Sequence, residues 1–267
     1  RNGQWWVPRL TPVSESSRTQ KQNSGNVVLA CDKPGILDSL HFEPDTRQPP
    51  KAGEVEVEVH AVGLNFKDVL MAMDVYAGQY DPFGQECAGR VSAVGEGVTH
   101  LKIGDAVFGP LMRSFATYAS GRAELLAKIP KGMDFETAAA LPIVFLTAHY
   151  ALHRIAGIRR GQRVLIHSAA GGVGMAAVHL ALRAGAEIYA TAGNSEKRKF
   201  LRSLGIKHVT DSRSTAFGDQ IAEAAKGNNM DIVLNSLTGD AIAAGLKLLR
   251  PGGCFVEIGK SGIWTEE

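Results

Sequence analysis

The pattern of hydrophobic and polar positions changes near residue 143 of the chain. Before that point, short β-rich runs separated by glycine turns predominate. The clearest run covers 54–59, where glutamate and valine alternate strictly. Such alternation predicts a half-buried strand with one apolar face and one charged face. Further strands are expected at 90–94 and 106–108, and closely spaced short strands favour a small barrel or sandwich.

From residue 163 onward, apolar strands alternate with helices, and a helical stretch at 135–152 leads into this region. Strands are expected at 163–167, 187–191, 208–210, 231–234 and 254–258, and helices at 175–184, 196–204, 217–225 and 241–249. Strands joined by helices of about ten residues are typical of a doubly wound parallel sheet. The sequence therefore predicts an α/β fold with three parts. These are an N-terminal arm or linker (1–25), a β-rich domain (26–143) and a doubly wound parallel-sheet domain (144–267).

Length and charge narrow the possible functions. The 267 residues suit two small domains, and a net charge of +2 gives no footprint for nucleic acid. There is no apolar run of about 18 residues, so no membrane span is expected. The N-terminus has no apolar signal core, and the three cysteines are far apart, so we expect a reduced, cytoplasmic protein. The missing initiator Met suggests that the chain is part of a longer protein.

A glycine-rich turn follows the strand at 163–167. Strand, turn (168–174) and helix occur in the order of the dinucleotide-binding fingerprint, with Ala169 where the first glycine usually stands. A backbone without Cβ atoms can approach the pyrophosphate, and the helix N-terminus offers N–H groups and a positive dipole end. The expected contacts are Ala170, Gly171, Gly172, Val173 and Gly174. The alternative is a glycine turn with a purely structural role.

The end of the second strand of this region indicates which nicotinamide cofactor is used. NAD sites usually place an acidic residue there, about 20 residues after the turn. Here that position falls within 191–194, which holds no acid. Gly193 and Ser195 are expected beside the ribose, and Lys197 and Arg198 suit a 2′-phosphate. The sequence therefore favours NADPH, although both cations could instead form a solvated helix face.

Two later strand ends are expected to reach the same crevice, because ligands bind outside the carboxyl ends of parallel strands. The first strand end carries Asn235, Ser236 and Leu237. The second carries Gly259 and Lys260. For Lys260, a solvated loop position is the alternative.

Several segments together resemble the medium-chain dehydrogenase/reductase superfamily. Within it, the chain is similar to the zinc-independent, quinone-oxidoreductase-like enoyl reductase domains of modular polyketide synthases. The matching segments are 63–70, 95–98, 104–107, 142–148, 167–180, 231–237 and 257–260. The most telling are Leu64-Asn65-Phe66-Lys67-Asp68 and Val233-Leu234-Asn235-Ser236-Leu237.

The resemblance implies a GroES-like substrate domain joined to the Rossmann domain, with the active site between them. It implies NADPH-dependent reduction of the α,β-double bond of an enoyl thioester. The thioester would be carried on an acyl carrier protein beside neighbouring synthase domains. By resemblance, Lys260 donates to the thioester oxygen and Tyr76 protonates the α-carbon, while Asn65 and Thr147 lie near the nicotinamide. The alternatives are a solvated loop position for Tyr76, and local hydrogen bonding or helix capping for Asn65 and Thr147.

The same resemblance argues against a metal. Zinc-dependent relatives carry a Gly-His-Glu segment where this chain has Gly84-Gln85-Glu86, and a catalytic Cys where it has Asn65. A catalytic zinc needs about three suitable protein ligands, so no metal is expected. Family members usually continue beyond the Gly-Lys segment and return to the substrate domain. This sequence ends at Glu267, so an acidic residue that the family's return segment would contribute cannot be assigned to a position in it.

Three other functions compete with this interpretation. A free-standing quinone or enone reductase of the same superfamily would need no carrier protein. A specialised synthase reductase would form a cyclopropane from a halogenated enoyl thioester. A nucleotide-binding domain kept for structure or docking would catalyse nothing.

Overall fold

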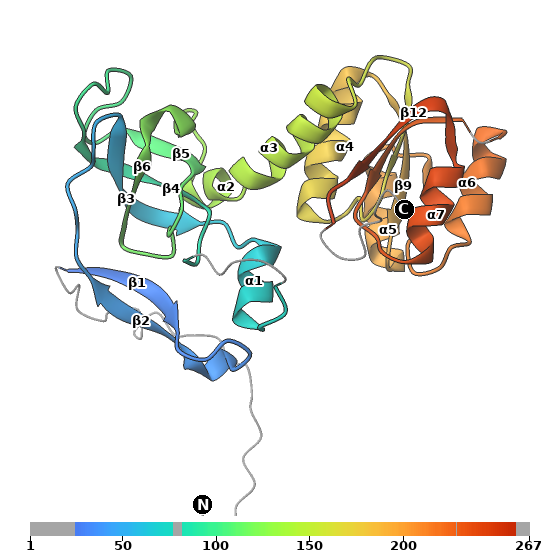
Figure 1. Cartoon of the computed structure of the whole chain (residues 1–267). Helices are drawn as coiled ribbons and strands as arrows, with labels where there is room; N and C mark the ends of the chain where they lie inside the picture. The colour runs from blue at the N-terminus through green and yellow to red at the C-terminus, as the bar shows by residue number, and fades with distance from the viewer. Residues whose placement is uncertain (1–24, 77–81, 228, 260–267) are drawn as a thin grey trace, which may run out of the picture.

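The computed structural model describes residues 25–76, 82–227 and 229–259. Within these ranges the chain forms two five-stranded β-sheets, joined by one helical segment, and a two-stranded sheet (Figure 1). The expected N-terminal arm, apart from residue 25, lies outside the described residues, and so does Lys260.

The first sheet is antiparallel, in the order β6-β3-β4-β5-β7. Its strands are β3 (Glu54–Val62), β4 (Glu86–Val94), β5 (Ala106–Pro110), β6 (Tyr118–Arg122) and β7 (Ala127–Lys128), and a short 3-10 turn, η3 (Ala123–Leu125), precedes the last. The side chains of Val55, Val57, Val91 and Val107 fill its core. The predicted β-rich domain is therefore confirmed.

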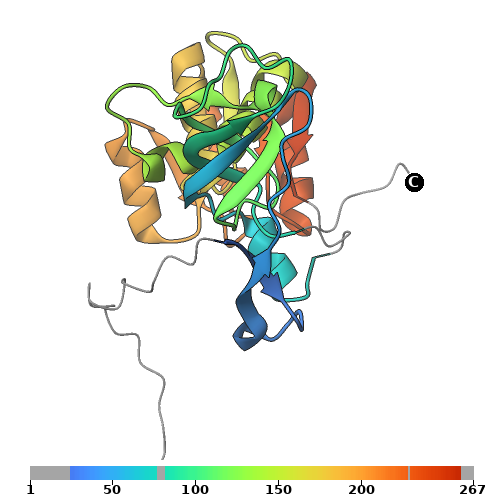
Figure 2. The same ribbon diagram turned by 90° about the vertical axis from the view of Figure 1, so that its left-hand side faces the viewer.

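A separate hairpin and a short helix lie together at one end of this sheet (Figure 2). The hairpin pairs β1 (Asn26–Cys31) with β2 (Leu40–Asp45) through the 3-10 turn η2 (Leu37–Ser39), and the helix is α1 (Phe66–Ala72). Met71 and Ala72 of α1 pack with Phe83 against Leu29 of the hairpin.

The strict alternation over 54–59 does not place all three glutamates in solvent. Glu56 is only 3% exposed, and the pairing of β3 with β4 shifts register directly after it. Its carboxylate accepts hydrogen bonds from Arg47 Nη2 (2.5 Å) and Ser92 Oγ (2.7 Å). Burial alone would raise the pKa of Glu56, but these partners lower it below its ordinary value. The predicted strand is confirmed, and its charged face includes one glutamate that the fold buries.

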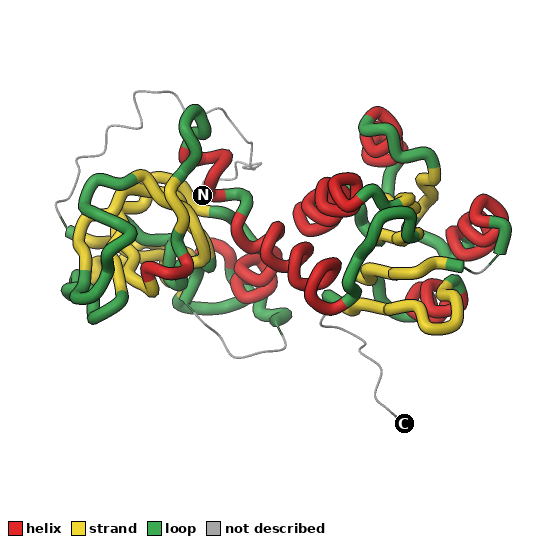
Figure 3. The backbone as a smooth tube through the Cα atoms, turned by 90° about the horizontal axis from the view of Figure 1, so that it is seen from above, coloured by secondary structure: helices red, strands yellow, loops and turns green. Residues whose placement is uncertain are grey.

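The second sheet is parallel, in the order β10-β9-β8-β11-β12. Its strands are β8 (Arg163–Ile166), β9 (Glu187–Ala192), β10 (His208–Asp211), β11 (Met230–Asn235) and β12 (Leu249–Glu257). Its helices are α4 (Gly172–Ala184), α5 (Ser195–Ser203), α6 (Phe217–Ala225) and α7 (Asp240–Lys247). The helices cover both faces of the strands (Figure 3). This is the predicted doubly wound α/β fold, and its strand order reverses between β8 and β11.

The connecting segment consists of α2 (Phe135–Ala139), α3 (Pro142–His149) and the π-helical turn η4 (Tyr150–Ile155). α2 packs on β4 of the first sheet and α3 packs on α4 of the second (Figure 1). Phe135–Ile155 is the one helical segment in the described parts of the chain that is long and apolar enough to cross a membrane. We take this as weak evidence for a span, because helices packed inside a protein core pass the same test.

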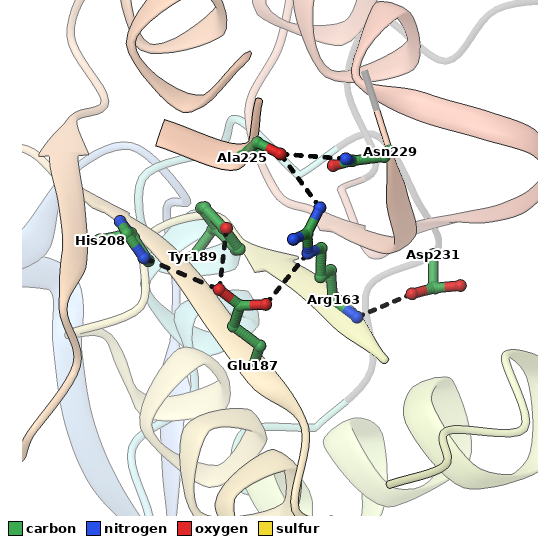
Figure 4. A network of polar contacts seen from close by, with 7 residues as sticks. All are labelled: Arg163, Glu187, Tyr189, His208, Ala225, Asn229 and Asp231. Carbon is green, nitrogen blue, oxygen red and sulfur yellow. Dashed lines mark hydrogen bonds and ion pairs between the residues drawn. The ribbon is translucent and has the colours of Figure 1, made fainter. Parts of the chain in front are cut away.

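A polar network ties together the amino ends of the parallel strands (Figure 4). Arg163 donates to Glu187 Oε2 (3.0 Å) and to the carbonyl oxygen of Ala225 (3.1 Å), and its backbone N–H donates to Asp231 (2.8 Å). Tyr189 donates to Glu187 (3.0 Å), and burial together with this carboxylate raises the pKa of Tyr189 to about 12. Ligands bind at the opposite, carboxyl edge of such sheets, so this network belongs to the scaffold.

Candidate active site

The glycine-rich turn lies at the carboxyl end of β8, where the strand order reverses. Ser168 adopts the left-handed conformation (φ 49°), whereas Ala169 does not. Ala169 is completely buried, and its N–H donates to the carbonyl oxygen of Thr191 on β9 (2.9 Å). The turn therefore needs no glycine at 169, which explains the departure from the usual fingerprint.

Two glycines allow close packing around the turn. A Cβ on Gly174 would lie 2.7 Å from Ala169 Cα and would also overlap the carbonyl oxygen of Ser168. A Cβ on Gly172 would lie 3.0 Å from Val144 Cγ1 of α3. Helix α4 begins at Gly172, so its free N–H groups and positive dipole end face the mouth of the turn. The close packing brings the helix N-terminus up to the turn, an arrangement that fits a pyrophosphate.

A buried pair beneath the turn was not identified from the sequence. Thr191 Oγ1 lies 3.0 Å from His167 Nδ1 and accepts a hydrogen bond from the N–H of Ser168 (3.3 Å). The Thr191 hydroxyl can therefore donate to Nδ1, which leaves the imidazole proton on Nε2. Within the described residues Nε2 has no hydrogen-bond partner. Burial lowers the pKa of His167 to about 4, so it holds the turn as a neutral side chain.

The ends of β11 and β12 meet at the same edge. Asn235 is completely buried, and its Nδ2 donates to the carbonyl oxygen of Leu237 (2.8 Å) and to Glu257 Oε2 (2.6 Å). The N–H of Gly259 donates to Glu257 Oε1 (2.6 Å). Ser236 Oγ is buried and has no partner among the residues that the structure describes. An unpartnered hydroxyl at this edge fits a ligand that would complete its hydrogen bonding.

The structure separates the two cations that were expected to bind a 2′-phosphate. Lys197 is exposed in the first turn of α5, after Ser195, and Asn194 caps that helix by accepting from the Lys197 N–H (2.8 Å). Arg198 Nη1 already donates to the carbonyl oxygen of Ala192 (2.9 Å) and pairs with Asp211 (3.0 Å). Arg198 therefore fixes α5 to β9 and β10.

A third cation, Arg213, was missed by the sequence analysis. A Cβ on Gly193 would lie 3.2 Å from Arg213 Nε, so the guanidinium group lies over the backbone that follows β9. The Arg213 side chain is exposed, and Arg213 stands two residues after the end of β10. The strand-end rule that drew attention to Asn235 and Lys260 would have found it if it had been applied to β10.

The first domain contributes Asn65, which lies at the N-cap of α1. Its Nδ2 donates to Glu86 Oε1 (2.8 Å), and Glu86 Oε2 accepts from the N–H of Ile143 in the first turn of α3 (2.8 Å). Thr147 lies one turn further along α3 and is half-buried. Asn65 and the helix that carries Thr147 are therefore linked through one carboxylate.

Tyr76 follows α1 and is half-buried against the Met71, Ala72 and Phe83 cluster. Lys67 Nζ lies 5.3 Å from the centre of its ring. An apolar hollow of about 270 Å³ adjoins this cluster, lined by Leu29, Ala30, Cys31, Pro34, Met71, Pro82 and Phe83. Tyr76 lies outside any helix or strand and packs beside apolar surface.

Fold and site together define a class of protein. A doubly wound sheet with a phosphate-binding turn at its switch point is a nucleotide-binding domain, and the β-rich domain is joined to it through the helical segment α2–α3. Such a pairing is typical of oxidoreductases that use a nicotinamide nucleotide.

Comparisons with known proteins agree with this class. The family model "Alcohol dehydrogenase GroES-like domain" matches residues 51–133, and the model "Zinc-binding dehydrogenase" matches 172–266. Erythronolide synthase EryA2 of Saccharopolyspora erythraea is 47% identical over 97% of the chain, which spans 7% of that synthase.

Three solved structures cover about nine tenths of the chain. The CurK enoyl reductase is 47% identical with a TM-score of 0.87, and the CurF cyclopropanase of the curacin A pathway is 37% identical with a TM-score of 0.83; each aligns over 91% of this chain and 76% of its own. The Escherichia coli quinone oxidoreductase complexed with NADPH is 30% identical with a TM-score of 0.80, over 90% and 76%.

The chain therefore belongs to the enoyl reductases of polyketide synthases, within the medium-chain dehydrogenase/reductase superfamily. It is an oxidoreductase domain that uses a nicotinamide nucleotide. The resemblance inferred from the sequence motifs is confirmed, and so is the combination of a GroES-like domain with a Rossmann domain.

One of the matching family models is named for zinc, but the described residues do not fit a zinc site. No three His, Cys, Asp or Glu side chains in those parts of the chain are grouped so that they could hold a metal ion. Glu86, the one acidic residue of the Gly84-Gln85-Glu86 segment, already accepts two hydrogen bonds from protein N–H groups. We therefore derive no step through a metal.

Proposed function

We propose that the chain catalyses NADPH-dependent reduction of the α,β-double bond of an enoyl thioester carried on an acyl carrier protein during polyketide chain extension. The observation that carries the proposal is the 47% identity to the CurK enoyl reductase over 91% of the chain. The cofactor turn fits the same reaction, because its backbone accommodates a pyrophosphate at the switch point of the sheet.

The proposal assigns the cofactor to the carboxyl edge of the parallel sheet. Residues 170–174 would hold the pyrophosphate, and Gly193 and Ser195 would lie beside the adenosine ribose. Asn235, Ser236, Leu237 and Gly259 would line the nicotinamide end. We propose NADPH because Lys197 and Arg213 offer two exposed cations where an NAD site would carry an acid. When bound, the cofactor supplies the hydride.

The substrate would approach from the side of the first domain. Leu64 and Phe66 flank Asn65 and are 70% and 74% exposed, and Leu146 beside Thr147 is 53% exposed. Exposed apolar side chains of this size next to a polar site suit an acyl chain. This supports a fatty or polyketide acyl substrate more than a small polar one.

Charge control and protonation are assigned to two side chains. Reduction at the β-carbon leaves negative charge on the thioester oxygen, and a cation beside that oxygen lowers the barrier. We assign this to Lys260, which lies outside the described residues. Tyr76 is assigned to protonate the α-carbon, because its ring packs beside the apolar hollow and Lys67 lies near it.

The proposed setting is a multidomain synthase in the cytoplasm. The 97% coverage of this chain against 7% of EryA2 supports neighbouring synthase domains and a carrier protein as partners. Cys31, Cys87 and Cys254 carry free thiols, which suits a reducing compartment.

NADPH oxidation, followed at its near-ultraviolet band, tests the proposal. The acceptor is crotonyl thioester on a pantetheine mimic, and parallel assays use NADH and a free quinone. Rapid turnover with NADPH and thioester is expected. Turnover with quinone alone would instead support the free-standing reductase, and no turnover with any acceptor would support a non-catalytic domain. An enoyl thioester with a halogen on its γ-carbon tests for the specialised reductase, because after hydride addition the enolate α-carbon would displace the halide and give a cyclopropane.

A further inference from the structure

Glu86 is a buried carboxylate between the first domain and the connecting helix α3, and the proposed mechanism does not use it. It is 2% exposed at the start of β4. A Cβ on Gly63 would overlap Glu86 Oε1, so the glycine makes room for the carboxylate. Burial of a carboxylate costs free energy unless hydrogen bonds compensate it, and a position maintained at that cost calls for a specific role.

The two carboxylate oxygens of Glu86 have different partners. Oε2 accepts from the backbone N–H of Ile143 (2.8 Å), which can only donate, and the N-terminus of α3 favours negative charge there. Oε1 accepts from Asn65 Nδ2 (2.8 Å). Burial raises the pKa of Glu86 above its ordinary value, the hydrogen bonds from Ile143 and Asn65 oppose that rise, and nearby Asp68 adds to it.

These contacts fix the polarity of the Asn65 amide. An ionised carboxylate only accepts, so the amide nitrogen faces Glu86. The amide oxygen Oδ1 faces away from Glu86, toward the backbone N–H of Asp68 in the capping box of α1. The backbone N–H of Asn65 is held separately by Asp68 Oδ2 (3.0 Å), and Asp68 Oδ1 accepts from the N–H of Gly84 (3.0 Å). The backbone of Asn65 is therefore fixed at the start of α1.

We propose that Glu86 is a positioning residue: its carboxylate sets which end of the Asn65 amide faces the nicotinamide and ties Asn65 to the first turn of α3, which carries Thr147. This rests on the proposed function, because it takes Asn65 and Thr147 to lie at the nicotinamide. Val144 of α3 also contacts Gly172 of the cofactor turn, so the same helix connects Glu86 with the pyrophosphate site.

Replacing Glu86→Gln tests this with a nearly isosteric side chain. The introduced amide has one acceptor oxygen, which the immobile Ile143 N–H retains. Its NH2 group then faces Asn65, whose amide must turn over and present Nδ2 to the cofactor. We expect NADPH affinity and kcat to fall about tenfold, the factor for about 1.4 kcal/mol in one reversed hydrogen bond.

A second change should restore the polarity. With Glu86→Gln and Asn65→Asp together, one carboxylate oxygen accepts from the introduced amide and the other faces the cofactor as an acceptor. We expect the double variant to recover most of the loss, whereas Asn65→Asp alone sets two carboxylates against each other and is the most impaired. Such non-additivity identifies a direct interaction between the two side chains.

Glu56→Gln is the matched control, because Glu56 is equally buried in the neighbouring strand but pairs with Arg47 and Ser92. It should lower the thermal unfolding midpoint and leave NADPH affinity and kcat unchanged. NADPH affinity is measured from the fluorescence of the bound cofactor, so this readout needs no acceptor.

The results distinguish the two proposals. If the unaltered protein binds NADPH but reduces no enoyl thioester, the proposed function fails while the affinity series still tests Glu86. If the unaltered protein is active and Glu86→Gln matches it in affinity and kcat, the positioning role is refuted. A double variant no better than Glu86→Gln would also refute it, because a merely structural loss would not be recovered.

Discussion

Arg213→Ala should weaken NADPH binding and leave NADH binding almost unchanged. The Arg213 guanidinium lies over Gly193, directly after β9, where a dinucleotide-binding fold holds the adenosine ribose. A 2′-phosphate on that ribose would be within reach of the exposed Arg213 and Lys197. NADH lacks this phosphate and gains nothing from either cation.

The size of the expected change in NADPH affinity follows from the exposure of Arg213. A hydrogen bond to a charged group contributes about 1.5–3 kcal/mol, and solvent screening favours the lower end at an exposed position. About 1.4 kcal/mol corresponds to a tenfold change in Kd, so Arg213→Ala should raise the NADPH Kd about tenfold. Lys197→Ala should have a similar or smaller effect, because lysine binds phosphate as a point charge without the bidentate geometry of arginine.

Fluorescence titrations with NADPH and NADH, each at low and high salt, measure these changes. Arg183→Ala is the control, because Arg183 lies in the last turn of α4, at the end of the helix away from the cofactor turn. Adding salt should reduce the difference in NADPH Kd between the unaltered protein and Arg213→Ala. If Arg213→Ala keeps the ratio of NADPH to NADH affinity, the assignment of Arg213 to the phosphate is refuted.

Three further predictions concern the cofactor turn and the proposed donor. Gly174→Ala should weaken NADPH binding at least about tenfold, because the new Cβ would lie 2.7 Å from Ala169 Cα. The control Gly218→Ala should bind NADPH normally, because its Cβ would meet nothing nearer than 3.7 Å. Equal NADPH affinities of the two variants would contradict this prediction. Lys260→Ala should lower kcat for crotonyl thioester and leave NADPH affinity nearly intact, and an unchanged kcat would remove Lys260 from the mechanism. The pKa of His167 is about 4 in the fold against an ordinary 6.5, so the unfolded chain takes up this proton first and stability should fall as the pH drops from 6.5 to 4. The loss in the free energy of unfolding should approach about 3 kcal/mol, at about 1.4 kcal/mol per pH unit. Urea unfolding at a series of pH values should show that His167→Asn lacks this part of the decline. If the stability of the unaltered protein and of His167→Asn depends on pH in the same way, the role of His167 is refuted.

The strand and helix pattern of the second domain was predictable because local sequence decides it. Apolar runs of strand length alternate with helices, and each predicted element has a counterpart within a few residues. The cofactor turn was predictable for a related reason. Dinucleotide sites of this kind need residues without a Cβ where the backbone approaches the pyrophosphate and where helix and strand pack closely, and Gly171 and Gly174 stand at these positions. In both cases the relevant interactions lie within a short stretch of chain.

The buried carboxylates could not be predicted in this way. Glu54, Glu56 and Glu58 occupy equivalent positions in an alternating strand, yet only Glu56 is buried, because Arg47 and Ser92 reach it from other segments. Glu86 and Asp68 likewise depend on partners 57 and 16 residues away. Hydrophobic periodicity contains no information about such distant partners.

The cations near the end of β9 also show that the sequence alone does not reveal the partners of a charged side chain. Charge and position alone made Lys197 and Arg198 equivalent candidates for the 2′-phosphate. The fold gives Arg198 a carboxylate from β10 and a backbone carbonyl as partners, and it brings in Arg213 from the next strand end. A guanidinium that is already paired would have to give up those bonds to bind a ligand, whereas an exposed one would not. What distinguishes these cations is therefore the number of hydrogen bonds that each can still form with a ligand, and this number depends on the tertiary structure. For this reason Arg213→Ala is a sharper test of NADPH selectivity than Arg198→Ala.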